Sequence, residues 1–152
     1  MTLSVVDRLE LSDLVHRYAG YVDARRFDDV TELFTATSQL VVPKPPERLD
    51  PCVHHDGRAG VRAAMAALDG ITRTHHAIGG EIYTGTAASD AATGAIAGVA
   101  HHWVDGDGGL TDSVWYLRYA DEYRRTAAGW RITLRQLSID AIEIRPARQV
   151  RP

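Results

Sequence analysis

The chain has 152 residues, of which 45% are hydrophobic, and its 17 basic and 20 acidic side chains give a formal net charge of -3. This length fits one compact domain, predicted over residues 1–152, and the weak negative charge argues against nucleic acid or an anionic membrane as a partner. A single cysteine, Cys52, excludes an intramolecular disulfide. No apolar run approaches the roughly 20 residues of a membrane span, and the N-terminal residues lack the pattern of a signal peptide, so a soluble cytoplasmic protein is expected.

The N-terminal half of the chain is predicted to be mainly helical. Apolar residues recur there at three- and four-residue spacing, which is typical of amphipathic helices, and prolines interrupt the pattern. The predicted elements are a helix over Val6–Ala24, a short helix over Asp28–Phe34, a strand over Gln39–Val42, a proline-rich loop over Pro43–Pro51 and a helix over Arg58–Asp69.

After Gly70 the pattern changes to the two-residue alternation of strands. Four long strands are predicted, over Arg73–Tyr83, Ala91–Val104, Ser113–Arg125 and Trp130–Ile144. In the third strand Trp115, Leu117 and Tyr119 alternate with polar residues, so one face is expected to be buried and the other solvated. Helices followed by a long antiparallel sheet predict an α+β domain.

The last strand carries a break in its alternation. The apolar residues are at even-numbered positions as far as Leu134, and the next one, Leu137, is at an odd-numbered position. Either a bulge shifts the register near Arg135, or Gln136 and Ser138 project polar groups into an interior cavity.

Six of the seven histidines form three doublets, His54-His55, His75-His76 and His101-His102. Imidazole titrates near neutral pH, so a cluster of histidines suggests proton transfer or metal ligation. Adjacent residues on a strand point to opposite faces, so each strand doublet can place one histidine in a common pocket. The first doublet is expected to lie in a solvated loop.

Several short motifs together resemble the SnoaL-like, scytalone dehydratase-like branch of the nuclear transport factor 2-like superfamily. The motifs are Tyr18-Ala-Gly-Tyr-Val-Asp23, Phe27-Asp28, Leu33-Phe34, Gly57, Thr74-His-His-Ala-Ile-Gly-Gly80 and Gly129-Trp-Arg-Ile132. The resemblance implies a cone-shaped fold, in which three N-terminal helices pack on a strongly curved mixed sheet and enclose a pocket. The superfamily includes dehydratases, isomerases, polyketide cyclases, epoxide hydrolases and proteins without catalysis, so fold alone does not assign a function.

The resemblance implies that Asp23 orients His76, which acts as a general base. Asp23 falls at the C-terminal end of a predicted helix, where the dipole disfavours a carboxylate, so a compensating contact is expected. The alternatives to His76 are pairing with Arg25 or Arg26 in solvent, or capping of the following turn. The second catalytic histidine of the family matches His101, as a general acid. Apolar residues flank both His101 and His102 on their own faces of that strand, so the sequence does not show which histidine faces inward, and His102 is the alternative.

The expected substrate-binding residues are Tyr21, Trp103, Trp115 and Tyr119. Trp130 is expected to belong to the core instead. The family pattern has two tyrosines that hold a water on the substrate carbonyl, and their positions here are Val22 and Val42, which cannot donate hydrogen bonds. Activity on scytalone itself is therefore not expected.

These features predict a lyase or isomerase of the dehydratase or cyclase type, without cofactor or metal. Its substrate would be a small apolar or aromatic, cyclic or polyketide-like carbonyl compound, and the chain would assemble as a homodimer or homotrimer. The first alternative is a non-catalytic module for ligand binding or dimerisation. The second is a metal-dependent enzyme that uses Asp23, His76 and His101 as ligands.

Overall fold

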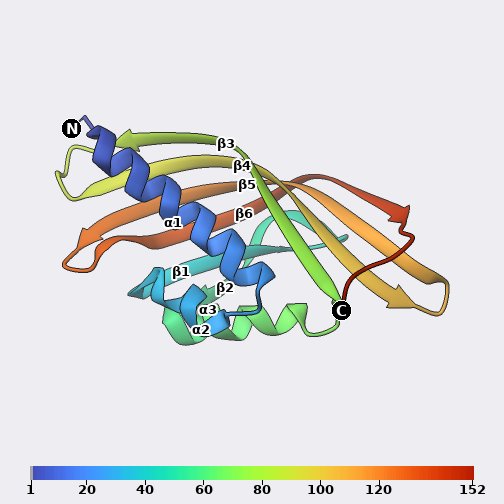
Figure 1. The fold of residues 1–152 in the computed structure, drawn as a ribbon. Coiled ribbons are helices and arrows are strands. Elements are labelled where there is room, and N and C mark those ends of the chain that lie inside the picture. The colour runs from blue at the N-terminus through green and yellow to red at the C-terminus, as the bar shows by residue number, and fades with distance from the viewer. Residues whose placement is uncertain (1) are drawn as a thin grey trace.

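The structure, a computed structural model, describes residues 2–152; Met1, the first residue of the predicted domain, lies outside the described residues. The helices are α1 Val5–Asp23, α2 Phe27–Glu32 and α3 Gly57–Ala64, which continues as a 3-10 turn over Met65–Leu68. The strands are β1 Phe34–Lys44, β2 Arg48–Asp56, β3 Arg73–Gly85, β4 Ala91–Gly106, β5 Gly109–Thr126 and β6 Gly129–Pro146. The predicted α+β class is confirmed (Figure 1).

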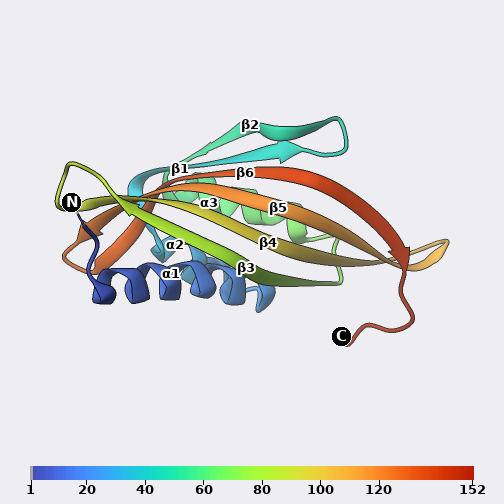
Figure 2. The ribbon, with the colours of Figure 1, turned by 90° about the horizontal axis from the view of Figure 1, so that it is seen from above.

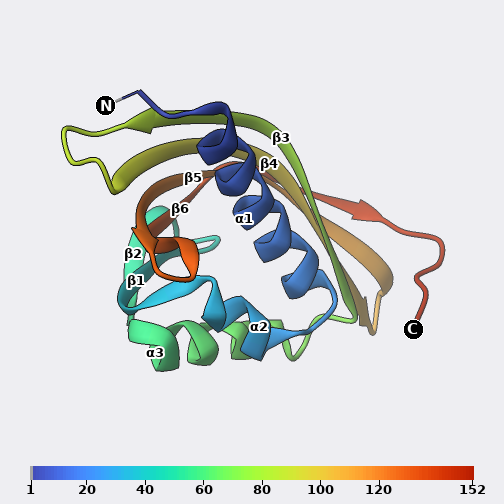
Figure 3. The same cartoon turned by 60° about the vertical axis from the view of Figure 1, so that its left-hand side comes forward.

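All six strands form one mixed sheet in the order β2-β1-β6-β5-β4-β3. Strand β1 runs parallel to β6, and the other neighbouring pairs are antiparallel. The sheet is strongly curved, and α1 lies across its hollow side, as Figures 2 and 3 show from two directions. Helix α1 packs against β3 and helix α3 against β1, so the hollow side becomes the hydrophobic core. None of the helices within residues 2–152 is long and apolar enough to cross a membrane.

The predicted loop over Pro43–Pro51 is wrong. Strand β1 continues through Pro43 to Lys44, and β2 begins at Arg48, so the first histidine doublet lies on a strand. Pro43 falls where the β1–β2 register shifts, and Pro51 lies on the edge strand of the sheet. Bulges and edge strands are the places in a sheet that tolerate proline, so its presence did not end the strands.

The first turn of α1 is attached to the sheet by Asp7. The Asp7 carboxylate accepts hydrogen bonds from the backbone and hydroxyl of Ser4, at 3.0 and 2.8 Å, and completes a capping box with it. It also pairs with Arg125 on β5 and accepts from Nε1 of Trp130 on β6 at 3.2 Å. Trp130 is 2% exposed, which confirms the prediction that it belongs to the core.

One extra residue in β6 decides which of its later side chains face inward. Ile132 pairs with Tyr123 on β5, but Leu134 pairs with Glu122, so Thr133 is a bulge. The predicted bulge is therefore present, just before Arg135. Beyond it, Arg135 rather than Gln136 points into the core, where it is completely buried.

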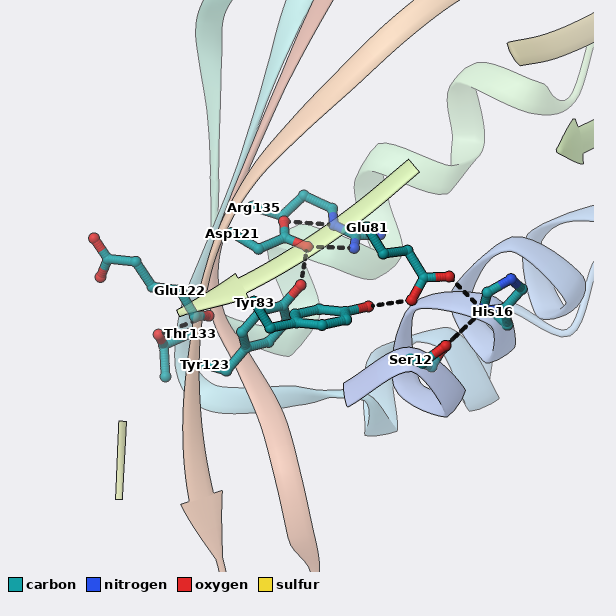
Figure 4. A network of polar contacts seen from close by, with 9 residues as sticks. All are labelled: Ser12, His16, Glu81, Tyr83, Asp121, Glu122, Tyr123, Thr133 and Arg135. Carbon is teal, nitrogen blue, oxygen red and sulfur yellow. Dashed lines mark hydrogen bonds and ion pairs between the residues drawn. The ribbon is translucent and has the colours of Figure 1, made fainter. Parts of the chain in front are cut away.

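Arg135 is neutralised inside the core by Asp121 on β5 (Figure 4). Its Nε and Nη2 donate to the two carboxylate oxygens at 2.9 and 2.6 Å, and the hydroxyl of Tyr123 donates to the same carboxylate at 2.6 Å. The guanidinium packs on the rings of Tyr18 and Tyr119, 4.2 and 4.0 Å from their centroids. The pair therefore joins α1, β5 and β6 through charge, hydrogen bonds and cation–π contacts.

Replacing Asp121 with Asn should strongly destabilise the fold, because a buried guanidinium would lose the charge that compensates it. We expect the free energy of unfolding, measured by urea denaturation, to fall by about 3–5 kcal/mol. The matched control is Asp140→Asn, which removes the solvent-exposed partner of Arg118 and should change stability little. Equal losses in the two variants would contradict the structural role of the buried pair.

Candidate active site

A mostly apolar cavity of about 390 Å³ lies between α1, the α3 region and the hollow face of the sheet. Apolar side chains form most of its wall, among them Leu40, Met65, Leu68, Trp115, Leu117 and Leu137. The polar side chains that reach it are Tyr18, His55, His76, His102 and Tyr119. No Asp, Glu, Lys or Arg is among the described residues that line it. The cavity therefore suits a small uncharged molecule.

Asp23, the last residue of α1, is bound to β3 through three hydrogen bonds. Its Oδ1 accepts from Thr74 Oγ1 at 2.9 Å and lies 2.6 Å from Nδ1 of His76, while its Oδ2 accepts from the His76 backbone at 2.8 Å. The expected contact between Asp23 and His76 is thus present. These hydrogen bonds also offset the unfavourable interaction between the carboxylate and the negative C-terminal end of the helix dipole. The catalytic role of the two residues stays a prediction.

The surroundings of Asp23 favour its ionised form. Burial raises the pKa of the Asp23 carboxyl, but the hydrogen bonds and charge of His76, with the hydroxyl of Thr74, outweigh burial and hold that pKa below its ordinary value. An ionised carboxylate can only accept, so Nδ1 of His76 carries the hydrogen. In the neutral ring Nε2 then has a lone pair, as a general base requires.

The second histidine of the cavity is His102, and the expected inward direction of His101 is wrong. The rings of His76 and His102 lie 6.1 Å apart between centroids. Nδ1 of His102 donates to the Ser113 carbonyl at 2.9 Å, and its ring lies 4.3 Å from that of Trp115. Burial is the main reason why the pKa of His102 lies below its ordinary value.

His101 points to the opposite face of the sheet. Its Nδ1 lies 2.6 Å from Oδ2 of Asp112, and its ring stacks on Trp103 at 5.3 Å and 10°. The alternation along β4 explains both directions, since His102 shares the buried parity of Ile96 and Ala100. The apolar residues that share the parity of His102 could have indicated its inward direction. However, Val99 and Trp103 are apolar residues with the parity of His101, so the sequence favoured neither histidine.

Two of the four expected substrate-binding residues line the cavity, Trp115 and Tyr119. Trp103 does not, because it shares the outer face with His101. Tyr21 does not either: it lies on the far side of α1, where its hydroxyl accepts a hydrogen bond from Arg17 at 3.0 Å.

His55 is a cavity residue that the sequence did not reveal. It lies on β2 opposite Leu40 of β1. The prolines of this segment had predicted a loop instead of a strand, so His54-His55 was expected to be solvated. Each doublet therefore contributes one histidine to the cavity: His55, His76 and His102.

The ligand set of the metal alternative is not assembled. His101 faces away from Asp23 and His76, and within residues 2–152 no three His, Cys, Asp or Glu side chains gather closely enough to hold a metal ion.

Helices that pack on the hollow side of a strongly curved mixed sheet, with an apolar cavity between them, define a domain of the nuclear transport factor 2-like superfamily. Residues 4–136 match the model of the SnoaL-like domain, and the chain belongs to this family. A comparison with curated proteins gives no significant match.

Solved structures share this fold over nearly their whole length. The Kfla4162 protein from Kribbella flavida is 30% identical over 91% of this chain and 93% of its own, with a TM-score of 0.76. A candidate aromatic ring hydroxylase from Novosphingobium aromaticivorans is 22% identical over 95% and 96%, with a TM-score of 0.80. A candidate scytalone dehydratase from the same organism is 14% identical over 97% and 93%, with a TM-score of 0.78.

The lowered pKa of His102 should make the fold less stable in mild acid. The unfolded chain binds a proton at this residue near pH 6.5 and the folded chain at lower pH, so stability falls as the pH drops from about 6.5 toward the folded pKa. The contribution cannot exceed about 1.4 kcal/mol per pH unit. Urea denaturation across this window should show a shallower pH dependence for His102→Gln than for the wild type. His101→Gln is the control that keeps the His102 contribution; identical slopes in His102→Gln and the wild type would refute it.

Proposed function

We propose that this chain is a cofactor-independent lyase or isomerase of the SnoaL-like type, with His76 as its general base and Asp23 as the residue that orients it. The observation that carries the proposal is the 2.6 Å contact between Asp23 Oδ1 and His76 Nδ1 at the wall of an apolar cavity. Family membership and the fold shared with a candidate scytalone dehydratase support the same class of reaction.

The chemistry would be abstraction of a proton from carbon next to a carbonyl. Asp23 holds the hydrogen on Nδ1, which directs the lone pair of Nε2 toward the reacting hydrogen. Once His76 is protonated, the adjacent carboxylate stabilises the imidazolium. The low polarity of the cavity strengthens that interaction and limits competition from water.

The cavity wall supports a small apolar or aromatic, ring-containing carbonyl compound as the substrate. Its described lining has no side chain that is permanently charged, so a carboxylate or phosphate on the substrate would have no partner. Trp115 and Tyr119 add aromatic side chains to the wall, which favours contact with a ring. His102, and not His101, faces the cavity, so we assign the second imidazole contact with the substrate to His102.

A non-catalytic ligand-binding module is the second candidate function. It is favoured by Val22 and Val42, which line the cavity at the two positions where the family pattern has tyrosines. Without those hydroxyls, the remaining phenol groups at the wall are those of Tyr18 and Tyr119. A protein that only binds its ligand would use the cavity but not the proton-transfer pair.

Deuterium exchange separates the two candidates without knowledge of the natural substrate. The protein is incubated in D2O with a panel of cyclic ketones, such as tetralones, and NMR follows exchange of the hydrogens next to the carbonyl. We expect His76→Gln and Asp23→Asn to reduce the exchange rate about 10²- to 10⁴-fold, the usual contribution of a general base.

The outer face of the sheet supplies matched controls for this assay. His75→Gln and Asp112→Asn alter an imidazole and a carboxylate outside the cavity, and they should leave exchange unchanged. Unchanged rates in His76→Gln and Asp23→Asn would exclude the proposed base, and ligand binding without any exchange would favour the non-catalytic module.

A further inference from the structure

The two neighbouring imidazoles on the sheet wall of the cavity, those of His76 and His102, carry hydrogen on the same ring nitrogen. A carbonyl oxygen can only accept a hydrogen bond, so the 2.9 Å contact between His102 Nδ1 and the Ser113 carbonyl places the hydrogen on Nδ1. The contact of His76 with Asp23 places it on Nδ1 in the same way. Each neutral ring is therefore left with a lone pair on Nε2.

The surroundings of His102 keep this arrangement in place. Trp115 packs on one side at 4.3 Å, and the ring of His76 meets it edge to face at 6.1 Å. Reversing the tautomer would set the lone pair of Nδ1 against the Ser113 carbonyl. Burial opposes a positive charge on His102 and outweighs the hydrogen bond to the Ser113 carbonyl and the nearby Asp112 and Asp23, which favour that charge.

A neutral ring in this state cannot serve as a general acid through Nε2. It has no hydrogen there to give to a departing hydroxyl group, and gaining one would require a charge that burial disfavours. It can, however, accept a hydrogen bond from a donor in the cavity. The described lining offers no cationic side chain that could compete for this place.

We propose that His102 is a specificity-determining residue that accepts a hydrogen bond from a hydroxyl group of the substrate, and that this hydroxyl stays on the product. The inference rests on the proposed function, because it places the substrate in the same cavity. The substrate is then a neutral, ring-containing carbonyl compound with at least one free hydroxyl group.

The reaction that fits this assignment is a proton shift rather than loss of water. His76 removes a proton from carbon next to the carbonyl, the C–H bond breaks, and its electron pair moves to the carbonyl oxygen as an enolate. The same proton returns from Nε2 of His76 to another atom of the conjugated enolate. His76 ends neutral, no group leaves, and the substrate keeps its formula.

The tautomer of His102 can be tested directly on the unmodified protein. Long-range hydrogen–nitrogen NMR correlation of histidine-labelled protein distinguishes a ring nitrogen that carries hydrogen from one that does not. At neutral pH we expect the His102 signal to show hydrogen on Nδ1 and a bare Nε2, assigned by its loss in His102→Phe. A hydrogen on Nε2, or a doubly protonated ring, would overturn the inference.

Ligand selection can be tested with 2-naphthol and 2-fluoronaphthalene, which have similar shapes but differ in the hydrogen-bond donor. By calorimetric titration, the wild type should bind 2-naphthol about 3- to 10-fold more tightly, the range of one neutral hydrogen bond. His102→Phe should abolish this preference and still bind both compounds, whereas His101→Phe, altered on the opposite face, should retain it. A preference that survives in His102→Phe, or that is missing from the wild type, would overturn the inference.

These measurements fail independently of the proposed catalysis. If ketone exchange is absent but the naphthol preference depends on His102, the proposed base is wrong while the acceptor role stands. If exchange depends on His76 but the preference does not depend on His102, the acceptor role is wrong and the general base stands.

Discussion

Helix α1 is bound to the sheet by a carboxylate at each end, and the cavity depends on this attachment. Asp7 in the first turn contacts Arg125 and Trp130, and Asp23 at the last residue contacts Thr74 and His76. The Asp7 contacts also satisfy the backbone at the helix start, where a negative charge is favoured. Asp23 stands at the unfavourable end, so its hydrogen bonds must compensate the helix dipole. The same bonds that hold the helix over the sheet therefore orient the imidazole.

The patterns in the sequence predicted the α+β class and the four long strands, and the resemblance to the SnoaL-like family implied the contact between Asp23 and His76. The hydrophobic periodicity of a long strand or of an amphipathic helix can be recognised from that segment alone, without knowing which segments it packs against. The division of each strand doublet between two faces followed from alternation alone. The choice between His101 and His102 did not, because apolar residues occupy both parities of β4 and pairing with β3 and β5 decides which parity is buried.

The remaining features depend on pairing between distant segments. Strand β2 was hidden by prolines that only an edge position and a register shift make acceptable. The direction of Arg135 depends on one bulged residue, Thr133, whose effect appears only when β6 is laid beside β5. An arginine in a strand pattern normally indicates the solvated face; here the partner that makes its burial possible, Asp121, lies 14 residues earlier in the chain.

The outer face of the sheet carries a second Asp–His pair, His101 with Asp112, directly across the ladder from His75. Its 2.6 Å contact equals that of His76 with Asp23, yet it faces away from the apolar cavity. One molecule thus holds the same dyad in two places, one at the wall of an apolar cavity and one on the opposite face of the sheet. Comparing the reactivity of the two imidazoles toward one acylating reagent would measure what the apolar cavity adds to a dyad, because both dyads belong to the same molecule under the same conditions.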